Sequence, residues 1–158
     1  MKVIQTTYRE FRRQNGLTLI ELLIVFAIIS IIAVIGTPLY QGYRLKAKIG
    51  TGIVTMAPLQ RLSTEHFFLN GSWPADNLEA GAKTPETYAA NFVTSVTLTD
   101  TPSPGSIMLT YDNTALRALG NRNTIAYYPD VSSGNGGITW KCDAGTMDTR
   151  YRPSNCRS

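Results

Sequence analysis

The chain has few of the side chains that metal sites and active sites need. Its 158 residues include one histidine, His66, and two cysteines, Cys142 and Cys156. Two cysteines and a histidine distant in sequence do not match the ligand spacing of a zinc site. The sequence also has no phosphate-loop motif and no pattern that indicates a Ser/His/Asp catalytic triad. We therefore expect a protein that is not an enzyme and that needs no metal or cofactor, with His66 as a packed structural side chain.

Charge is scarce as well, and it is unevenly spread. Charged residues make up 16% of the chain, and the net charge is +4. Residues 1–16 carry most of that excess, in the form of Lys2, Arg9, Arg12 and Arg13 against Glu10. The remaining residues are close to neutral, so the basic pI of 9.2 describes the N-terminus more than the body. It is weak evidence for a nucleic-acid-binding protein.

Charges in the body are sorted by position. The cations come first, at Arg44, Lys46, Lys48 and Arg61. Acids follow, with Lys83 as the cation among them, at Glu65, Asp76, Glu79, Glu86, Asp100 and Asp112. Such blocks are typical of solvated faces, but in a self-associating protein they can also complement each other between copies and fix the register.

Long apolar runs are confined to one place, residues 17–35. Only Thr18, Glu21 and Ser30 interrupt this stretch with polar side chains. Roughly 20 helical residues cross the ~30 Å apolar core of a bilayer, and the basic flank favours a cytoplasmic N-terminus. A cleaved secretory signal would need a small-x-small site after the run, and residues 36–40 read GTPLY instead. Neither that alternative nor a plain membrane anchor explains Glu21.

Glu21 is the unexpected residue of the apolar run. A carboxylate at the centre of a bilayer costs about 2.5–3.5 kcal/mol, so an acid in such a segment is a functional candidate that needs a partner. If the chain is cut after Gly16, the new α-amine of Leu17 is a positive charge at a similar depth. In a stack of helices, the amine of one copy could meet Glu21 of another, and both charges would be neutralised upon assembly.

The segments around these residues resemble the N-terminal signature of type IV pilins and the related pseudopilins. Residues 16–22 read GLTLIEL, the apolar run follows, and residues 36–40 read GTPLY. Near the other end, residues 140–142 read WKC and residues 152–157 read RPSNCR, which is also similar to type IVa pilins. The resemblance covers both ends and the helix boundary at residues 70–74, NGSWP, while the middle matches only in pattern.

The resemblance implies a processing route and a location. Residues 1–16 would be a leader (a class III signal peptide) that a prepilin peptidase removes after Gly16, with N-methylation of Leu17. Residues 17–37 would be the transmembrane and assembly half of a helix, and residues 38–158 the amphipathic half and the globular head. Glu21 would be the assembly carboxylate. Subunits would wait in the bacterial inner membrane and then enter an extracellular pilus, with an assembly platform and an external ATPase motor as partners.

Residues 17–70 read as one extended helical segment, because apolar residues continue at a spacing of three to four through residue 62. Its first half would project from the small head. Pro38 and Pro58 each remove one helical hydrogen bond, and Asn70-Gly71 is a helix stop. We expect the weakest point at Gly36–Pro38, and the resemblance implies loss of helix there in many pilus fibres. Pro38 is therefore assigned to assembly together with Glu21.

The C-terminal half alternates apolar and polar residues in four short segments, residues 92–99, 107–111, 123–128 and 138–142. This pattern predicts a four-stranded antiparallel sheet with its apolar face on the amphipathic helix, and hence an α+β fold. The first segment is expected to bury Phe92, Thr94, Val96 and Leu98 on one face. Cys142 and Cys156 allow a single intramolecular pairing, which would close a disulfide-bounded loop at the C-terminus.

Three functions are compared. The first is a structural subunit of a type IV pilus, a homopolymer used for adhesion, twitching motility or DNA uptake. The second is a minor pilin that binds DNA itself, through cations around the C-terminal loop: Lys141, Arg150, Arg152 and Arg157. The third is a pseudopilin of a type II secretion system, which shares the N-terminus but for which the C-terminal loop is less typical.

Overall fold

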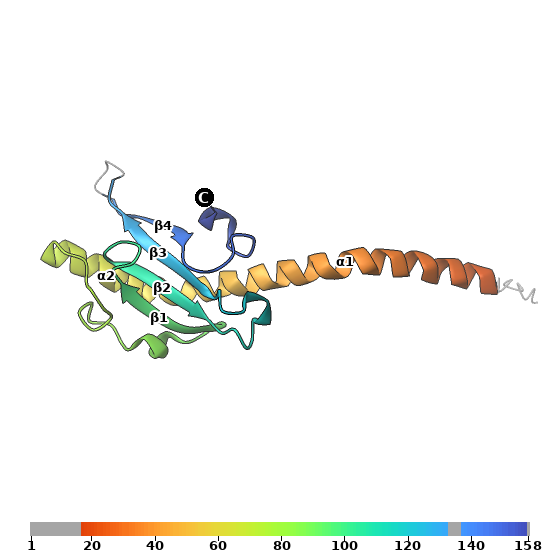
Figure 1. Ribbon diagram of the computed structural model, residues 1–158, viewed down its shortest axis with the longest axis horizontal. Coiled ribbons are helices and arrows are strands. Elements are labelled where there is room, and N and C mark those ends of the chain that lie inside the picture. Colours follow the sequence, from red (N-terminus) through yellow and green to blue (C-terminus); the bar gives the residue numbers. More distant parts are fainter. Residues whose placement is uncertain (1–16, 133–136, 158) are drawn as a thin grey trace, which may run out of the picture. The chain divides into compact units, whose positions relative to one another are not determined.

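The computed structural model describes residues 17–132 and 137–157. The chain divides into two compact units, one ending at Leu39 and the other covering Tyr40–Ser158. Figure 1 shows the elements of both. The predicted leader, residues 1–16, and the predicted cleavage position at Gly16 lie outside the described residues.

Two helices form the N-terminal part, as the apolar spacing predicts. Helix α1 spans Leu19–Ile53, a 3₁₀ turn follows at Val54–Met56, and helix α2 spans Ala57–Asn70. Pro58 lies in the first turn of α2, where its missing N–H is not needed. The prediction of one helical segment is thus confirmed except for this short turn. Pro38 lies inside α1, which continues through it.

Helix α2 ends where the sequence predicts. Gly71 adopts the left-handed conformation (φ 73°) that glycine accepts without strain. Its N–H donates to the carbonyl of Phe67 at 2.9 Å and so satisfies one of the free carbonyls of the last turn. Trp73 then folds back and stacks on Phe67 with ring centroids 4.3 Å apart. The stop at Asn70-Gly71 is confirmed.

The C-terminal half forms the predicted four-stranded antiparallel sheet. Its strands are β1 (Val93–Thr99), β2 (Ser106–Tyr111), β3 (Thr124–Asp130) and β4 (Thr139–Ala144). They pair in sequence order, β1-β2-β3-β4, so that β1 and β4 are the two edges. The α+β class and the strand count are confirmed.

The predicted face of the first strand is wrong at its start. Val93 is buried, whereas Phe92 and Thr94 are exposed. Phe92 has a positive φ of 71°, which is incompatible with a strand, and the pairing of β1 with β2 shifts register between Val93 and Ser95. This bulge brings Val93 and Val96 to the same side although they are three residues apart. The later alternation of β1 is as predicted.

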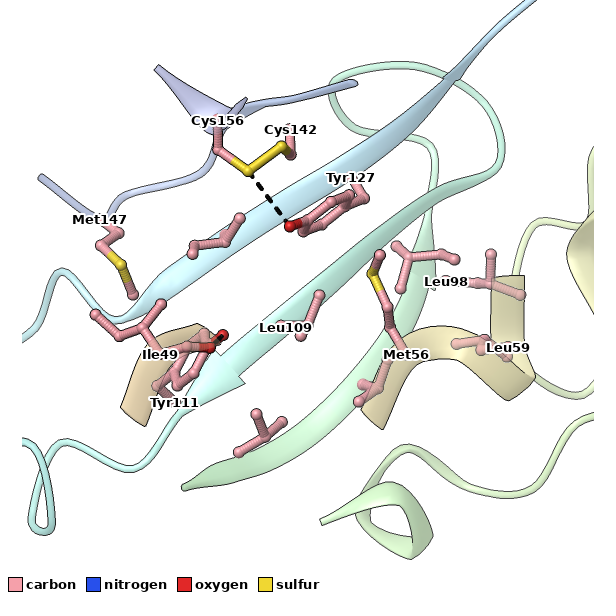
Figure 2. Close-up of a cluster of buried hydrophobic side chains, with 14 of the residues drawn as sticks. Ile49, Met56, Leu59, Leu98, Leu109, Tyr111, Tyr127, Cys142, Met147 and Cys156 are labelled. Atoms are coloured by element: carbon pink, nitrogen blue, oxygen red, sulfur yellow. Dashed lines mark hydrogen bonds between the residues drawn. A yellow bond between two sulfur atoms is a disulfide. The ribbon is translucent and has the colours of Figure 1, made fainter. Parts of the chain in front are cut away.

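The core lies between the helices and one face of the sheet. Ile49, Met56 and Leu59 from the helical segments join side chains of all four strands, as Figure 2 shows. On β2, Ile107, Leu109 and Tyr111 are all completely buried, as their spacing predicts. The buried Tyr111 hydroxyl donates to the Ile49 carbonyl at 2.8 Å, which links sheet to helix. Burial raises the pKa of this hydroxyl, so it stays protonated as a donor.

Gly52 allows the close approach of helix and sheet. A Cβ placed on Gly52 would lie 2.6 Å from the Tyr111 ring and 2.8 Å from a methyl of Val93. Gly50, on the same helix, has nothing within 4 Å of such a position. The two glycines therefore differ in packing while sharing the same low helix propensity.

We expect Gly52→Ala to lower the free energy of unfolding by about 1–3 kcal/mol, since the added methyl overpacks the interface. The matched control, Gly50→Ala, should raise it by about 0.5–1 kcal/mol through helix propensity alone. Both values come from denaturant unfolding of the full chain in detergent. Equal effects of the two substitutions would contradict the role of Gly52 as a spacer.

Candidate assembly helix and C-terminal loop

The start of α1 is organised around Thr18 and Glu21. Thr18 is the residue before the helix, and its Oγ1 accepts a hydrogen bond from the Glu21 N–H at 3.3 Å. The Leu22 N–H donates to the Thr18 carbonyl at 3.2 Å, which opens the helical ladder. Glu21 is also an acid in the first helical turn, where the exposed N–H groups favour negative charge. The carboxylate therefore has a local electrostatic benefit besides any partner in another subunit.

This cap was not predicted, although the sequence contains a signal for it. Thr18 and Glu21 match the S/T-x-x-E pattern of a capping box, in which the hydroxyl accepts a hydrogen bond from the backbone N–H three residues later. The pattern suggests a second role for Glu21, as a residue that helps to start the helix. An experiment on Glu21 must distinguish this role from a charge pair between subunits.

The first unit presents a long surface that is largely apolar. Every residue from 17 to 39 is exposed, including side chains such as Leu23, Phe26 and Ile32. Within the described residues, one helical stretch is long and apolar enough to cross a membrane, and none of its most apolar window is buried. A surface of this kind needs lipid or other protein chains to cover it.

The polar side chains inside that surface are satisfied by their own helix. The Ser30 hydroxyl donates to the Phe26 carbonyl and the Thr37 hydroxyl to the Ala33 carbonyl, each at 2.7 Å. Such bonds to the preceding turn remove the penalty of a free hydroxyl in an apolar setting. Glu21 is the charged residue of this unit among those described. It remains the group for which apolar surroundings are most unfavourable.

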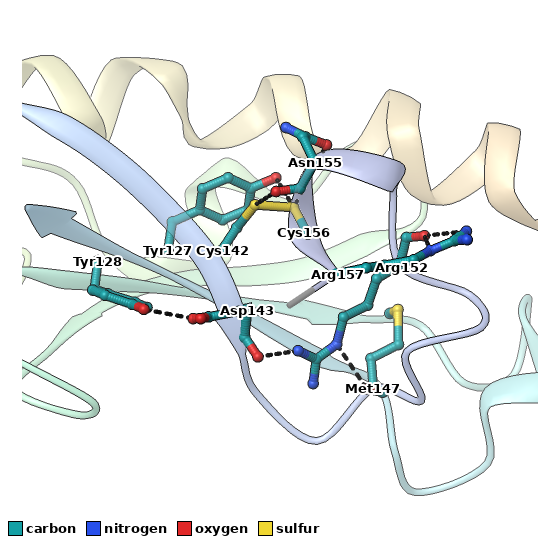
Figure 3. The surroundings of a disulfide bond; sticks show 9 residues. All are labelled: Tyr127, Tyr128, Cys142, Asp143, Met147, Arg152, Asn155, Cys156 and Arg157. Carbon is teal, nitrogen blue, oxygen red and sulfur yellow. Dashed lines mark hydrogen bonds between the residues drawn. A yellow bond between two sulfur atoms is a disulfide. The ribbon is translucent and has the colours of Figure 1, made fainter.

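The predicted disulfide is present between Cys142 on β4 and Cys156 in a 3₁₀ turn, Ser154–Cys156. The S–S distance is 2.01 Å and the Cα–Cα distance 4.7 Å. Both sulfurs are buried, and the Tyr127 hydroxyl lies 3.3 Å from the Cys156 sulfur, as Figure 3 shows. Burial raises the pKa of Tyr127 to about 12. The bridge is therefore part of the core and ties the C-terminus to the sheet.

A buried arginine completes the C-terminal loop. Arg152 is 6% exposed, and its guanidinium donates to the carbonyls of Met147 at 2.9 Å, Gly145 at 3.0 Å and Asp143. The Arg157 guanidinium in turn donates twice to the Arg152 carbonyl, at 2.9 and 2.8 Å (Figure 3). These bonds hold a loop with little regular structure in one conformation.

The four cations proposed from sequence as DNA contacts all have partners in their own chain. Arg152 is a correction, because its guanidinium is buried and donates to carbonyls of its own loop, where it holds the loop instead of facing a phosphate. Lys141 lies 2.6 Å from Asp130, and the pair raises the pKa of the lysine and lowers that of the acid. Arg150 lies 3.1 Å from Asp148. DNA binding by Lys141, Arg150 and Arg157 stays a prediction, and it would compete with these contacts.

Replacing both cysteines, as Cys142→Ala/Cys156→Ala, should lower the free energy of unfolding by about 3 kcal/mol, because the open chain gains the entropy of the freed loop. The separation of 14 residues sets that scale. The measurement is denaturant unfolding of the full chain in detergent. The wild-type chain under reducing conditions, which keeps both side chains, is the control. A loss below about 1 kcal/mol in both would show that the hydrogen bonds of Arg152 hold the loop by themselves.

Comparison with known proteins agrees with this arrangement. Residues 46–157 match the family described as pilin (bacterial filament), and residues 11–37 match the prokaryotic N-terminal methylation motif. The fimbrial protein EcpC of Eikenella corrodens is 32% identical over 145 residues, or 92% of each chain. The type IV major pilin protein PilE1 of Neisseria gonorrhoeae is 28% identical over 91% of this chain and 87% of its own. The type IV major fimbrial protein FimA of Dichelobacter nodosus is 30% identical over 91% of this chain and 96% of its own. With its apolar helix, four-stranded sheet and C-terminal disulfide, this chain belongs to the pilin family, as a type IV pilin.

Proposed function

We propose that this chain is made as a membrane-anchored prepilin and becomes a structural subunit of a type IV pilus through its N-terminal helix. In this proposal residues 1–16 are removed after Gly16 and Leu17 is N-methylated. Residues 17–37 then serve as the transmembrane and assembly segment, and residues 38–158 as the half-helix and head. The match to the methylation motif supports the processing step.

The observation that carries the proposal is the exposed apolar helix with one acid in its first turn. In the membrane, lipid covers residues 17–39; in a fibre, the helices of neighbouring copies would replace lipid by van der Waals packing. Glu21 would pair there with the α-amine of a neighbouring Leu17. The pairing becomes possible only when cleavage has created the amine, so assembly would require processing first.

The proposal requires further partners. A prepilin peptidase cuts the leader, and an inner-membrane platform receives the subunit. Extraction from lipid needs work, and the sequence has no phosphate-loop motif, so an external ATPase motor would supply that work. The resulting surface fibre would serve adhesion, twitching motility or DNA uptake. The relatives are named as pilins and fimbrial proteins, which favours a pilus over a secretion pseudopilin.

We place the weakest point of the assembly helix at Gly36–Pro38. Pro38 has no N–H to donate to the helical ladder, and a Cβ on Gly36 would meet nothing within 4 Å. Local loss of helix there would let the fibre extend. Complete amide protection across residues 33–40 in assembled fibres would contradict this assignment.

Mass analysis of sheared surface fibres tests the proposed function directly. We expect the chain as an abundant component that begins at Leu17 and carries one N-terminal methyl group. A mature chain beginning at Met1, or well beyond Ile35, would refute the mechanism, because the amine could not then meet Glu21.

A further inference from the structure

An open groove runs along the exposed side of α2. One part, of about 610 Å³, has apolar walls from Val54, Ala57, Pro58 and Leu62. A second part, of about 540 Å³, reaches Phe68 and Trp140. Ala57, Arg61 and Glu65 line both parts. Val54 and Phe68 are 69% and 65% exposed, so this side of α2 carries apolar surface that the head does not cover.

Arg61 is the cation of the groove. It is exposed, and it forms no ion pair with any acid in the part of the chain that the structure describes. Glu65, one helical turn later, is exposed and likewise unpaired among these residues. The groove thus combines apolar walls with one cation and one acid that form no ion pair among the described residues.

A protruding leucine lies on the connection between α2 and β1. Leu78 is 82% exposed, and the acids Asp76 and Glu79 flank it. A single exposed leucine is ordinary on a protein surface. This one differs from an ordinary exposed leucine because hydrogen bonds of Asp76, Asn77 and Glu79 fix the backbone around it.

Asn77 fixes the backbone at this point. It is 4% exposed, and its side-chain amide donates to the Val96 carbonyl at 3.0 Å and accepts from the Leu98 N–H at 2.7 Å. These two bonds satisfy one carbonyl and one N–H on the free edge of β1. The Glu79 N–H donates to Asp76 Oδ1 at 2.8 Å and tightens the turn further. Leu78 is therefore presented at little further cost in conformational entropy.

The Trp140 end of the groove and Leu78 are associated with opposite edges of the sheet. Trp140 lies on β4, and Asn77, next to Leu78, hydrogen-bonds to β1. The strand order β1-β2-β3-β4 places these strands at the two ends of the sheet, as Figure 1 shows. A contact between the two features of different copies is head-to-tail and can repeat along an open helical assembly.

We propose that Leu78 of one subunit docks into the α2 groove of a neighbouring copy of this chain, with Asp76 facing Arg61. The inference rests on the proposed assembly into a pilus and names one of its contacts between heads. The charges are complementary, since Asp76, two residues before the leucine, is opposite in sign to the unpaired Arg61. Lys83, on the same loop as Asp76, is likewise opposite in sign to Glu65 of the groove. One leucine in one groove is too small a contact to hold a fibre, so it sets the register while the apolar helices supply the association.

A cysteine pair tests the contact in fibres of the full chain. Leu78→Cys/Val54→Cys places one thiol on the protruding residue and one on the groove wall. We expect sheared fibres of this variant to run as a ladder of covalent oligomers without reductant and as monomer with it. The matched control, Asn121→Cys/Val54→Cys, uses an exposed position on the β2–β3 connection and should remain monomeric. Fibres of the test pair that crosslink no more than the control would overturn the inference while leaving pilus assembly intact.

Reversing the charge of Arg61 gives a second, independent test. Arg61→Asp places like charges opposite each other, and we expect it to lower fibre yield about fivefold or more, whereas Arg61→Lys keeps the charge and should leave the yield near that of the wild type. Asp76 is left unchanged, because its carboxylate also accepts from the Glu79 N–H within the turn. Unchanged yield of Arg61→Asp would refute the pairing. Absence of fibres from the wild-type chain would instead refute the proposed function on which the inference rests.

Discussion

Replacing Glu21 with valine is expected to abolish fibre assembly while the processed subunit accumulates in the membrane. The substitution makes the apolar segment more apolar, so insertion should not suffer. In a fibre, however, the α-amine of the neighbouring Leu17 would be left without its partner. Removing one member of a buried ion pair costs about 3–5 kcal/mol, and each 1.4 kcal/mol is a factor of about ten. We therefore expect the yield of sheared fibres to fall more than about a hundredfold.

Two further variants separate the charge pair from the helix cap. Glu21→Gln keeps the size and polarity of the side chain but removes the charge, so it should assemble as poorly as Glu21→Val. Thr18→Ala removes the hydroxyl that accepts from the Glu21 N–H while keeping the carboxylate, and its fibre yield should stay near that of the wild type. The opposite pattern, with Thr18→Ala defective and Glu21→Gln normal, would show that Glu21 acts by starting the helix. The yield of each variant is compared with its amount in the membrane fraction.

The sequence could predict the features that depend on local pattern. The apolar spacing through residue 62 and the glycine after Asn70 give the extent of the helices, because both follow from backbone geometry over a few residues. The alternation in residues 107–111 places Ile107, Leu109 and Tyr111 in the core for the same reason. Alternation failed where the backbone left the strand conformation, at Phe92 with its positive φ and at the following bulge.

Features that join distant residues were not predictable in this way. Asn77 reads as an ordinary loop residue, and its bonds to β1 cross about twenty residues. Gly52 reads as a residue of low helix propensity, whereas its value lies in the contact with Tyr111 and Val93. Residue type alone made Arg152 a candidate for phosphate binding, while in the fold its guanidinium serves three carbonyls of its own loop. Charged residues need their three-dimensional neighbours before a function can be assigned.

Replacing Gly16 with valine is expected to block processing and, through it, assembly. The uncut chain would keep residues 1–16, with an excess charge of +3, next to the apolar segment. It would also lack a free amine at Leu17, so Glu21 would have no partner in a neighbouring subunit. Mass analysis of the membrane fraction should find a chain 16 residues longer than the mature form, and sheared fibres should be absent.

The control for Gly16→Val is Gln14→Ala, which changes the leader near the cut but not at it and should be processed normally. Because Gly16→Val and Glu21→Val would both lose fibres, the mass of the retained subunit distinguishes them: uncut in the first, cut and methylated in the second. Uncut Gly16→Val chains that still enter fibres would show that Glu21 does not need the new amine. Such fibres would also show that an apolar bundle of helices tolerates a charged leader. We do not expect this, because burying unpaired charges is unfavourable.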